Sequence, residues 1–158
     1  MSDVHVRNMT KADLPRVGEL AGALVRLHHS WDARRFFLEE GVEQGYQWWF
    51  AKQLGQEGVV LQVAEVDGAI AGYVYGSLEE RDWAMLLDAH GAIHDVYVDA
   101  TFRRAGVAKA LMLSAIAALE AQGADQVVLS TSTSNPQAQA LFRSLGFRDT
   151  MIEMTRSK

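Results

Sequence analysis

The chain has 158 residues, 49% of them hydrophobic, which fits one globular domain with a sizeable core that we place at residues 1–158. Its net charge of −5 argues against broad nucleic-acid binding and weakly favours a cationic ligand, and no apolar stretch approaches the roughly 20 residues that span a bilayer. The absence of cysteine excludes a disulfide framework, and the start Met1-Ser-Asp-Val-His has no leader pattern, so we expect a cytoplasmic protein without a membrane partner.

The first half of the chain predicts two helices and three strands. In chain order they are a strand at 4–7, a helix from Thr10 to about His29, a helix from Arg34 to about Gln53, and strands at Val59–Val66 and Ala69–Leu78. Asp67-Gly68, between the last two strands, is a strong hairpin signal because both residues tolerate positive φ. Gly41 and Gly45 should split or bend the second helix. Thr10 with Asp13 is close to a capping box at the start of the first helix.

The second half alternates strands and helices. It predicts a loop at Glu79–Gly91, a strand at Ile93–Val98, a helix from about 106 to 122, a strand at Val127–Thr133, a short helix through Leu141-Phe142, and mixed strand character at Phe147–Thr155. The whole pattern predicts an α/β fold with a single mixed, mostly antiparallel sheet of six or seven strands flanked by helices.

The loop Arg103-Arg104-Ala105-Gly106-Val107-Ala108 has the composition of a pyrophosphate-binding loop. The first turn of a helix has about four backbone N–H groups without partners in the helix, and its dipole adds partial positive charge, so an anion is stabilised there. Gly106 allows close approach of the backbone, and Arg103 and Arg104 add charged donors. A glycine at an ordinary strand-to-helix turn gives the same short string, so the loop alone leaves both interpretations open.

A second motif follows the next predicted strand. It reads Asn135-Pro-Gln-Ala-Gln-Ala-Leu-Phe142-Arg-Ser-Leu-Gly146-Phe147. The order of strand, Arg/Gly loop, helix, strand, asparagine, helix and Gly-Phe resembles the GNAT superfamily of N-acetyltransferases, with a match over about residues 92–147. Phe142 departs from the family pattern, which usually has tyrosine at that position.

This resemblance implies a GNAT-like acyl-CoA N-acyltransferase fold and an acetyl-CoA-dependent N-acetyltransferase. The implied co-substrate is acetyl-CoA and the implied acceptor is a primary amine of a small molecule or peptide. Without cysteine no acetyl-cysteine intermediate can form, so we expect direct attack in a ternary complex. Two alternatives stay open: a non-catalytic acyl-CoA-binding or sensing module of the same fold, and a nucleotide-binding protein that uses the loop for another diphosphate. We expect no nucleic-acid partner and leave a homodimer open.

The resemblance also implies the acetyl-CoA site. Its residues would be Val96, Tyr97, Val98, Arg103, Arg104, Ala105, Gly106, Val107, Ala108, Lys109, Asn135 and Phe142. In this family neighbouring strands separate and leave unpaired strand amides, so Val96–Val98 would contribute backbone groups, whereas valine side chains in strands are mostly core. Asn135 matches the asparagine that contacts the cofactor arm, and before Pro136 it also fits a helix N-cap.

Proton transfer needs a base, because an amine acceptor is cationic at neutral pH. Our candidates are His94, Asp95 and Glu79, with the loop carboxylates Glu80 and Asp82 as further ones. Since side chains alternate along a strand, His94 and Asp95 should lie on opposite faces, with His94 on the face of Val96 and Val98. A related position of this strand often bears an acid in the family, which favours His94, although a solvated histidine would give the same sequence. For the leaving thiolate Phe142 has no proton to give, and water, Ser132, Ser134 or no acid at all would suffice.

By resemblance, the first two helices and the loop at 79–91 would wall the acceptor pocket. The polar and aromatic residues on them are His28, His29, Trp31, Asp32, Arg34, Arg35, Tyr46, Trp48, Trp49, Glu79, Glu80 and Trp83. The aromatic ones could form a flat-sided pocket for a small amine. The alternative, favoured for at least half of the set Trp48, Trp49, Phe36 and Phe37, is plain core between helix and sheet. We expect no metal site, since His28 and His29 point about 100° apart on a helix and no third ligand has suitable spacing.

Overall fold

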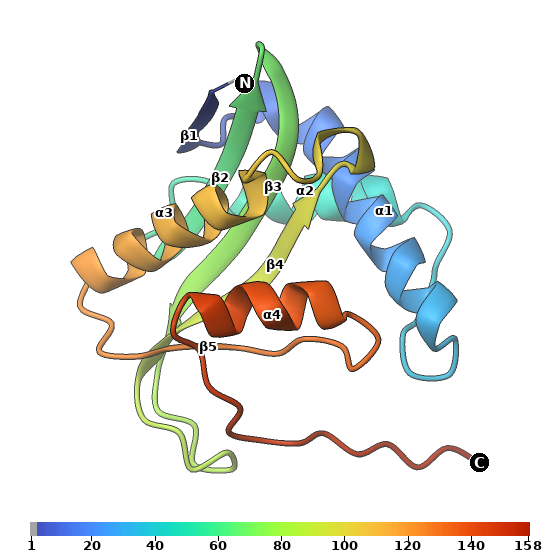
Figure 1. The fold of residues 1–158 in the computed structure, drawn as a ribbon, viewed down its shortest axis with the longest axis vertical. Helices are drawn as coiled ribbons and strands as arrows, with labels where there is room; N and C mark the ends of the chain where they lie inside the picture. Colours follow the sequence, from blue (N-terminus) through green and yellow to red (C-terminus); the bar gives the residue numbers. More distant parts are fainter. Residues whose placement is uncertain (1–2) are drawn as a thin grey trace.

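The computed structural model describes residues 3–158, which form one five-stranded sheet with helices on both faces (Figure 1). The elements in chain order are β1 (Val4–Asn8), the 3-10 helix η1 (Lys11–Asp13), α1 (Leu14–Trp31), α2 (Val42–Gln53), β2 (Val59–Val66), β3 (Ala69–Glu79), β4 (His90–Val98), the 3-10 helix η2 (Ala100–Phe102), α3 (Val107–Ala121), β5 (Val127–Leu129) and α4 (Pro136–Ser144). Among residues 3–158 no helix combines the length and the apolar character that crossing a bilayer requires.

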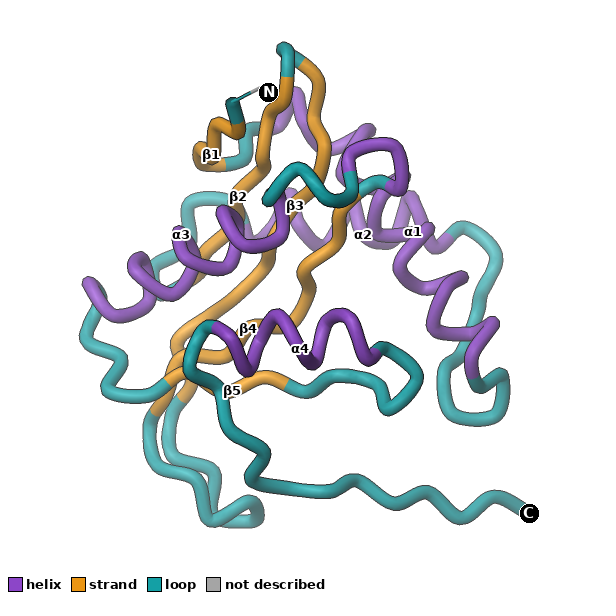
Figure 2. The backbone as a smooth tube through the Cα atoms, in the orientation of Figure 1, coloured by secondary structure: helices purple, strands orange, loops and turns teal. Residues whose placement is uncertain are grey.

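The strands lie in the order of the sequence, β1-β2-β3-β4-β5. The first four pair antiparallel, and β5 pairs parallel to β4 after the α3 crossover. Figure 2 shows β4 and the chain that follows β5 moving apart beyond their short region of pairing. This mixed sheet agrees with the predicted fold class.

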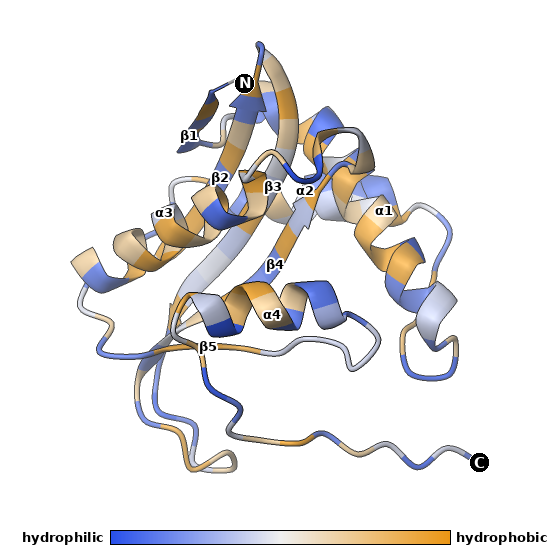
Figure 3. Ribbon diagram, viewed as in Figure 1, coloured by the Kyte–Doolittle hydropathy of each residue, from blue (hydrophilic) through white to orange (hydrophobic). Residues whose placement is uncertain are grey.

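Two separate apolar clusters hold the helices against the sheet. α3 and α4 cover one face, where Leu111, Met112 and Phe142 pack against residues of β2, β3 and β4. α1 and α2 cover the other face, where Val17 and Phe50 pack against β2 and β3. Figure 3 shows apolar residues concentrated on the strands and on parts of α1 and α3. We refer to these below as the α3 face and the α1/α2 face.

Local signals in the sequence explain where several elements begin and turn. Asp67 and Gly68 both have positive φ, 52° and 79°, as the predicted β2–β3 hairpin requires. Gly41, at φ 77°, is the N-cap of α2, so the predicted helix from Arg34 begins only at Val42. Asp13 accepts a hydrogen bond from the backbone N–H of Thr10 at 2.8 Å, which confirms the acidic half of the predicted capping box.

The expectation of six or seven strands is wrong, because residues 147–158 form no strand. Arg35 donates two hydrogen bonds to Glu153, at 2.6 and 2.8 Å, and Arg34 bonds the backbone carbonyl of Lys158. These contacts hold the C-terminal segment beside the loop that follows α1 rather than along β5. Its side chains Met151 and Ile152 are 70% and 78% exposed, so the segment buries little apolar area where it lies. In Figure 1 the segment runs alone below α4.

Candidate active site

A β-bulge in β4 determines which side chains meet at the site. Tyr75 of β3 pairs with Asp95, but the next residue, Gly76, pairs with Ile93, so His94 is one residue more than β3 can match. An extra residue resets the alternation of side chains. As a result His94 and Asp95 both lie on the α1/α2 face, while Val96 and Val98 pack in the cluster of the α3 face. The two predictions that His94 and Asp95 lie on opposite faces, and that His94 shares a face with the two valines, are therefore wrong.

His94 belongs to a chain of three polar side chains. Its Nε2 lies 2.7 Å from the hydroxyl oxygen of Ser77, and that hydroxyl donates to Oε1 of Glu79 at 2.7 Å. The carboxylate oxygen itself is 3.6 Å from Nε2. The ring of His94 also rests against the ring of Tyr75, with centroids 4.9 Å apart. The structure thus brings together two of the three predicted candidate bases, His94 and Glu79, through a serine that sequence reasoning missed.

Asp95 points into the protein rather than to the same chain of side chains. It accepts a hydrogen bond from the hydroxyl of the fully buried Tyr73 at 3.0 Å. Burial raises the pKa of Asp95, and the hydrogen bond from Tyr73 offsets part of this shift. Burial also raises the pKa of Tyr46, to about 12, with a smaller contribution from the Asp95 charge. Asp95 is therefore placed as an internal partner of tyrosines.

The remaining loop carboxylates form no hydrogen bond or ion pair with His94 or Ser77 in the described part of the chain. Glu80 and Asp82 are exposed in the β3–β4 loop. Asp82 accepts a hydrogen bond from the backbone N–H of Met85 at 3.1 Å and forms an isolated bridge with Leu87, so it organises the loop.

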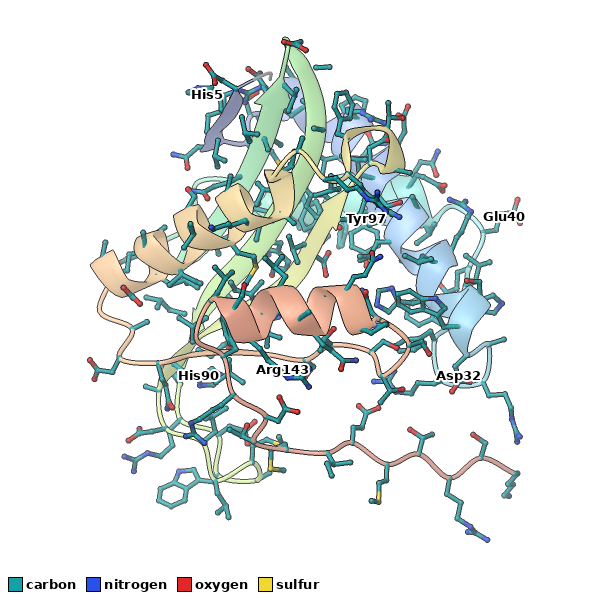
Figure 4. The ribbon with its side chains drawn as sticks, viewed as in Figure 1. His5, Asp32, Glu40, His90, Tyr97 and Arg143 are labelled. Carbon is teal, nitrogen blue, oxygen red and sulfur yellow. The ribbon has the colours of Figure 1, made fainter. Side chains whose placement is uncertain are left out.

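The strands β4 and β5 separate next to the bulge. They pair only from Gly91 to Ile93 on β4 and from Val127 to Leu129 on β5, so beyond Ile93 no strand among residues 3–158 pairs with that edge of β4. At the point of separation lies a cavity of about 240 Å³, lined by His90, Ala92, Ile93, His94, Val128, Leu129 and Ser130. Figure 4 shows His90 and Tyr97 toward opposite ends of β4. Backbone groups of β4 and the imidazoles of His94 and His90 therefore lie at the same place, and Nδ1 of His90 is hydrogen-bonded to the backbone carbonyl of Asp88.

The loop after β4 has the backbone of an anion site. Arg104 and Gly106 have left-handed φ values of 71° and 77°. Gly106 is the N-cap of α3, no side chain caps the helix there, and a Cβ on Gly106 would meet no atom within 4 Å. The first-turn N–H groups of α3 therefore face a place where backbone can approach a ligand closely. Arg103 donates to the backbone carbonyl of Val98 at 3.3 Å and lies over the ring of Tyr97, 5.7 Å from its centroid.

The other predicted cofactor residues divide between surface and core. Ala105 and Lys109 are exposed at the start of α3, Ala108 is half-buried, and Val107 is buried.

Two predicted residues lie at the ends of α4. Asn135 is its N-cap, with its side chain accepting from the backbone N–H of Ala138 at 3.2 Å, as one of its two expected roles requires. Phe142 is 7% exposed and packs edge-to-face on Phe147.

The aromatic residues of α2 are not the core that was favoured. Trp48, Trp49 and Phe37, the last of which precedes α2, are 60%, 43% and 68% exposed, and only Phe36 of the four is half-buried. The ammonium of Lys52 lies 3.8 Å from the ring centroid of Trp48. The buried aromatic of α2 is Phe50, which packs against the sheet in the cluster of the α1/α2 face. At the end of α1, His28 makes edge contacts with Trp31 and Phe36, and this cluster flanks the α1/α2 face near Asp95.

Sequence comparison relates the chain to known acetyltransferases. Residues 24–147 match the model of the acetyltransferase (GNAT) family. N-acetyltransferase 8 of Homo sapiens is 34% identical over 97 residues, which cover 61% of this chain and 42% of that protein. An N-alpha-acetyltransferase of Sulfurisphaera tokodaii is 28% identical over 113 residues, covering 66% of each. The chain thus spans less than two thirds of the length of these relatives.

Structural comparison shows the same fold. The aminoglycoside N-acetyltransferase AAC(6')-Iy, whose structure is a complex with CoA, superposes with a TM-score of 0.76. The superposition covers 100% of this chain and 96% of the other at 20% sequence identity.

Proposed function

The chain belongs to the acetyltransferase (GNAT) family, and we propose that it acts as a single domain that transfers the acetyl group of acetyl-CoA to a primary amine of a small molecule or peptide. The observation that carries this proposal is the position of His94, which stands on a bulge where β5 leaves β4. Three features follow one another along β4 and into α3: the imidazole of His94, the strand edge without a partner, and a helix N-terminus suited to bind an anion. Amine acetylation needs a base, donors for a developing oxyanion and a hold on the donor molecule.

The residues present fit acetyl-CoA. Arg103, Arg104 and the first-turn N–H groups of α3 would hold its pyrophosphate, and the open space at Gly106 lets the backbone approach the phosphates. Backbone groups of Val96–Val98 on the unpartnered edge would hold the pantetheine arm and the thioester carbonyl. Asn135 can cap α4 and contact the pantetheine arm at the same time. A similar fold in complex with CoA supports the same assignment.

The chain's own residues handle the protons. The acceptor enters as an ammonium, and His94 takes one proton from it so that the nitrogen lone pair is free. The neutral amine attacks the carbonyl carbon directly and the C–N bond forms. The nitrogen then loses its second proton to water, the C–S bond breaks, and CoA leaves as its thiolate, which is protonated to the thiol. Overall one proton is released per turnover. Phe142 has no hydroxyl, so the proton for the leaving sulfur comes from water or from a serine such as Ser132 or Ser134.

The acceptor is a small amine or a chain end in this proposal. The cavity of about 240 Å³ beside His94 has room for a compact group, and the negative net charge favours a cation. One observation favours a second function. Because Phe142 stands where the family usually has tyrosine, a module that binds acyl-CoA without turnover is the alternative.

An amine panel tests the proposal. Purified protein is mixed with acetyl-CoA and single amines, including polyamines, aminosugars and peptides with free N-termini, and thiol release is measured alongside the mass of the product. We expect thiol release that depends on one amine class and a product heavier by one acetyl group. Acetyl-CoA binding without product across the whole panel would favour the sensing module instead.

A further inference from the structure

We propose that Ser77 is a positioning residue that fixes the tautomer of His94, so that Nε2 carries the ring proton and Nδ1 is the atom that accepts the proton of the acceptor amine. This inference rests on the proposed acetyl transfer and names the atom that acts in it. It concerns one hydroxyl on β3 that was not among the predicted site residues.

Counting protons on the three side chains leads to this assignment. A carboxylate has only acceptor atoms, so the 2.7 Å contact between Ser77 and Glu79 uses the single proton of the serine hydroxyl. The serine oxygen then has no proton left for His94. The 2.7 Å contact between that oxygen and Nε2 therefore requires the proton of Nε2. In the neutral ring the remaining nitrogen, Nδ1, has a free lone pair.

The surroundings of the His94 ring distinguish its two nitrogens. Ser77 is 8% exposed, so its hydroxyl is held in the sheet rather than freely solvated. Tyr75, two residues earlier on the same face of β3, supports the flat side of the imidazole. The bulge at His94 aims the side chain at these two residues. The hydrogen bond to Ser77 distinguishes Nε2 from Nδ1, and the Tyr75 ring packs against the imidazole in a tilted contact.

The same arrangement stabilises the charged ring after proton transfer. When Nδ1 takes a proton from the acceptor, the imidazolium keeps its Nε2–H bond to Ser77, and the Glu79 carboxylate stands 3.6 Å from Nε2. Glu79 and the adjacent Asp95 are the carboxylates that face this histidine, with Tyr75 against the ring and His90 in the same cavity. The accepted proton leaves to water before the next turnover, so no further reactant is needed.

The test reads the tautomer directly on the free protein. Long-range ¹H–¹⁵N spectra of the histidine side chains distinguish the two neutral tautomers, and His94→Gln identifies the His94 signals by their loss. We expect neutral His94 as the Nε2–H form in the wild type and in Ser77→Thr, which keeps the hydroxyl. Ser77→Ala should give a mixture of tautomers. Glu79→Gln should keep the Nε2–H form, because the amide oxygen still accepts from Ser77. Ser144→Ala, which removes an exposed hydroxyl bonded only to its own helix, is the matched control.

Kinetics supply the second readout. With an accepted amine, Ser77→Ala should lower kcat/KM at least tenfold, within the roughly 10²–10⁴-fold that a whole general base contributes, and Ser77→Thr should restore most of it. Glu79→Gln should lower kcat/KM less than Ser77→Ala does, because the amide oxygen of glutamine still accepts from the Ser77 hydroxyl.

An Nδ1–H tautomer in the wild type, or the same tautomer and pH profile in Ser77→Ala, would overturn the inference while leaving acetyl transfer intact. If His94 has the Nε2–H form but no amine gives an acetylated product, the proposed function is wrong and the hydrogen bonds among Ser77, Glu79 and His94 have a structural role only.

Discussion

Tyr73 and Asp95 form a hydrogen-bonded pair between the sheet and helices α1 and α2, with 3.0 Å between the tyrosine hydroxyl and a carboxylate oxygen. Tyr73 is fully buried, and its pKa lies well above the ordinary value of a tyrosine, first because of burial and then because of the Asp95 charge. The pair stands one residue from His94 on the same face. Asp95 is thus bonded to a buried tyrosine, whereas the neighbouring His94 is the candidate base.

Replacing Asp95 with asparagine should stabilise the fold more as the pH rises. Burial raises the pKa of Asp95 above its ordinary 3.8, so between these two values the folded chain binds more protons than the unfolded chain, and stability falls as pH increases. Asparagine has no charge to bury, and its amide oxygen still accepts from Tyr73. We expect the Tm of Asp95→Asn to exceed that of the wild type by more at pH 7 than at pH 4, with kcat/KM retained within about tenfold. A loss of activity as large as that of a His94 variant would make Asp95 the base.

Replacing Gly106 with aspartate should weaken acetyl-CoA binding at least tenfold, about 1.4 kcal/mol, because a negative side chain enters the place where the phosphates approach. Calorimetric titration measures this. Gly123→Asp is the matched control, since Gly123 also has positive φ and open space but lies past the other end of α3. Both variants should lose similar stability from the strained backbone, and only the first should lose affinity. Equal acetyl-CoA affinity in the two would remove the loop from the site.

The kinetic route should be sequential. Because the chain has no cysteine, no acetyl-cysteine intermediate can form, so we expect both substrates to be bound together. Initial rates at several fixed amine concentrations should give intersecting double-reciprocal lines. Parallel lines, or an acetylated protein seen by intact mass after acetyl-CoA alone, would contradict direct transfer.

Restoring the family's tyrosine tests whether the missing hydroxyl matters. We expect Phe142→Tyr to keep at least the wild-type kcat, since it adds a proton donor and removes nothing. The free energy of unfolding should fall by about 1–3 kcal/mol if the new hydroxyl finds no partner in the core beside Phe147, and denaturant titration measures this loss. A kcat below a tenth of the wild type would mean that the site is shaped around the phenylalanine ring.

Most elements could be predicted because their signals are local. The Asp67-Gly68 turn, the glycine at the start of α2 and the Asn135-Pro136 cap fix backbone conformations within a few residues. The strand predicted at 147–155 does not form, because a β pattern forms a strand only where it pairs with a partner edge, and this segment lies beside Arg35 instead of along β5. The prediction that Trp48 and Trp49 are core was wrong because composition does not tell which side of a helix packs against the sheet.

The candidate site was harder to predict than the fold. His94 and Glu79 could be named from residue type, but their contact depends on the register of β3 against β4 and on a bulge that no local signal marks. Alternation placed His94 on the wrong face for that reason. Ser77 was missed although it shares a strand face with Glu79 at a spacing of two residues. That spacing, beside a strand that bears a histidine, is the signal that could have found it.

The most direct test of the account is the pH dependence of acetyl transfer with and without His94. Using the best amine of the panel, kcat/KM is measured for the wild type, His94→Gln and the control His5→Gln, whose side chain is exposed on β1 (Figure 4). We expect kcat/KM of the wild type and of the control to rise with pH to a common plateau. For His94→Gln we expect kcat/KM to be roughly a hundredfold lower and not to rise with pH. A His94→Gln protein with a near-normal rate and an unchanged profile would contradict the account.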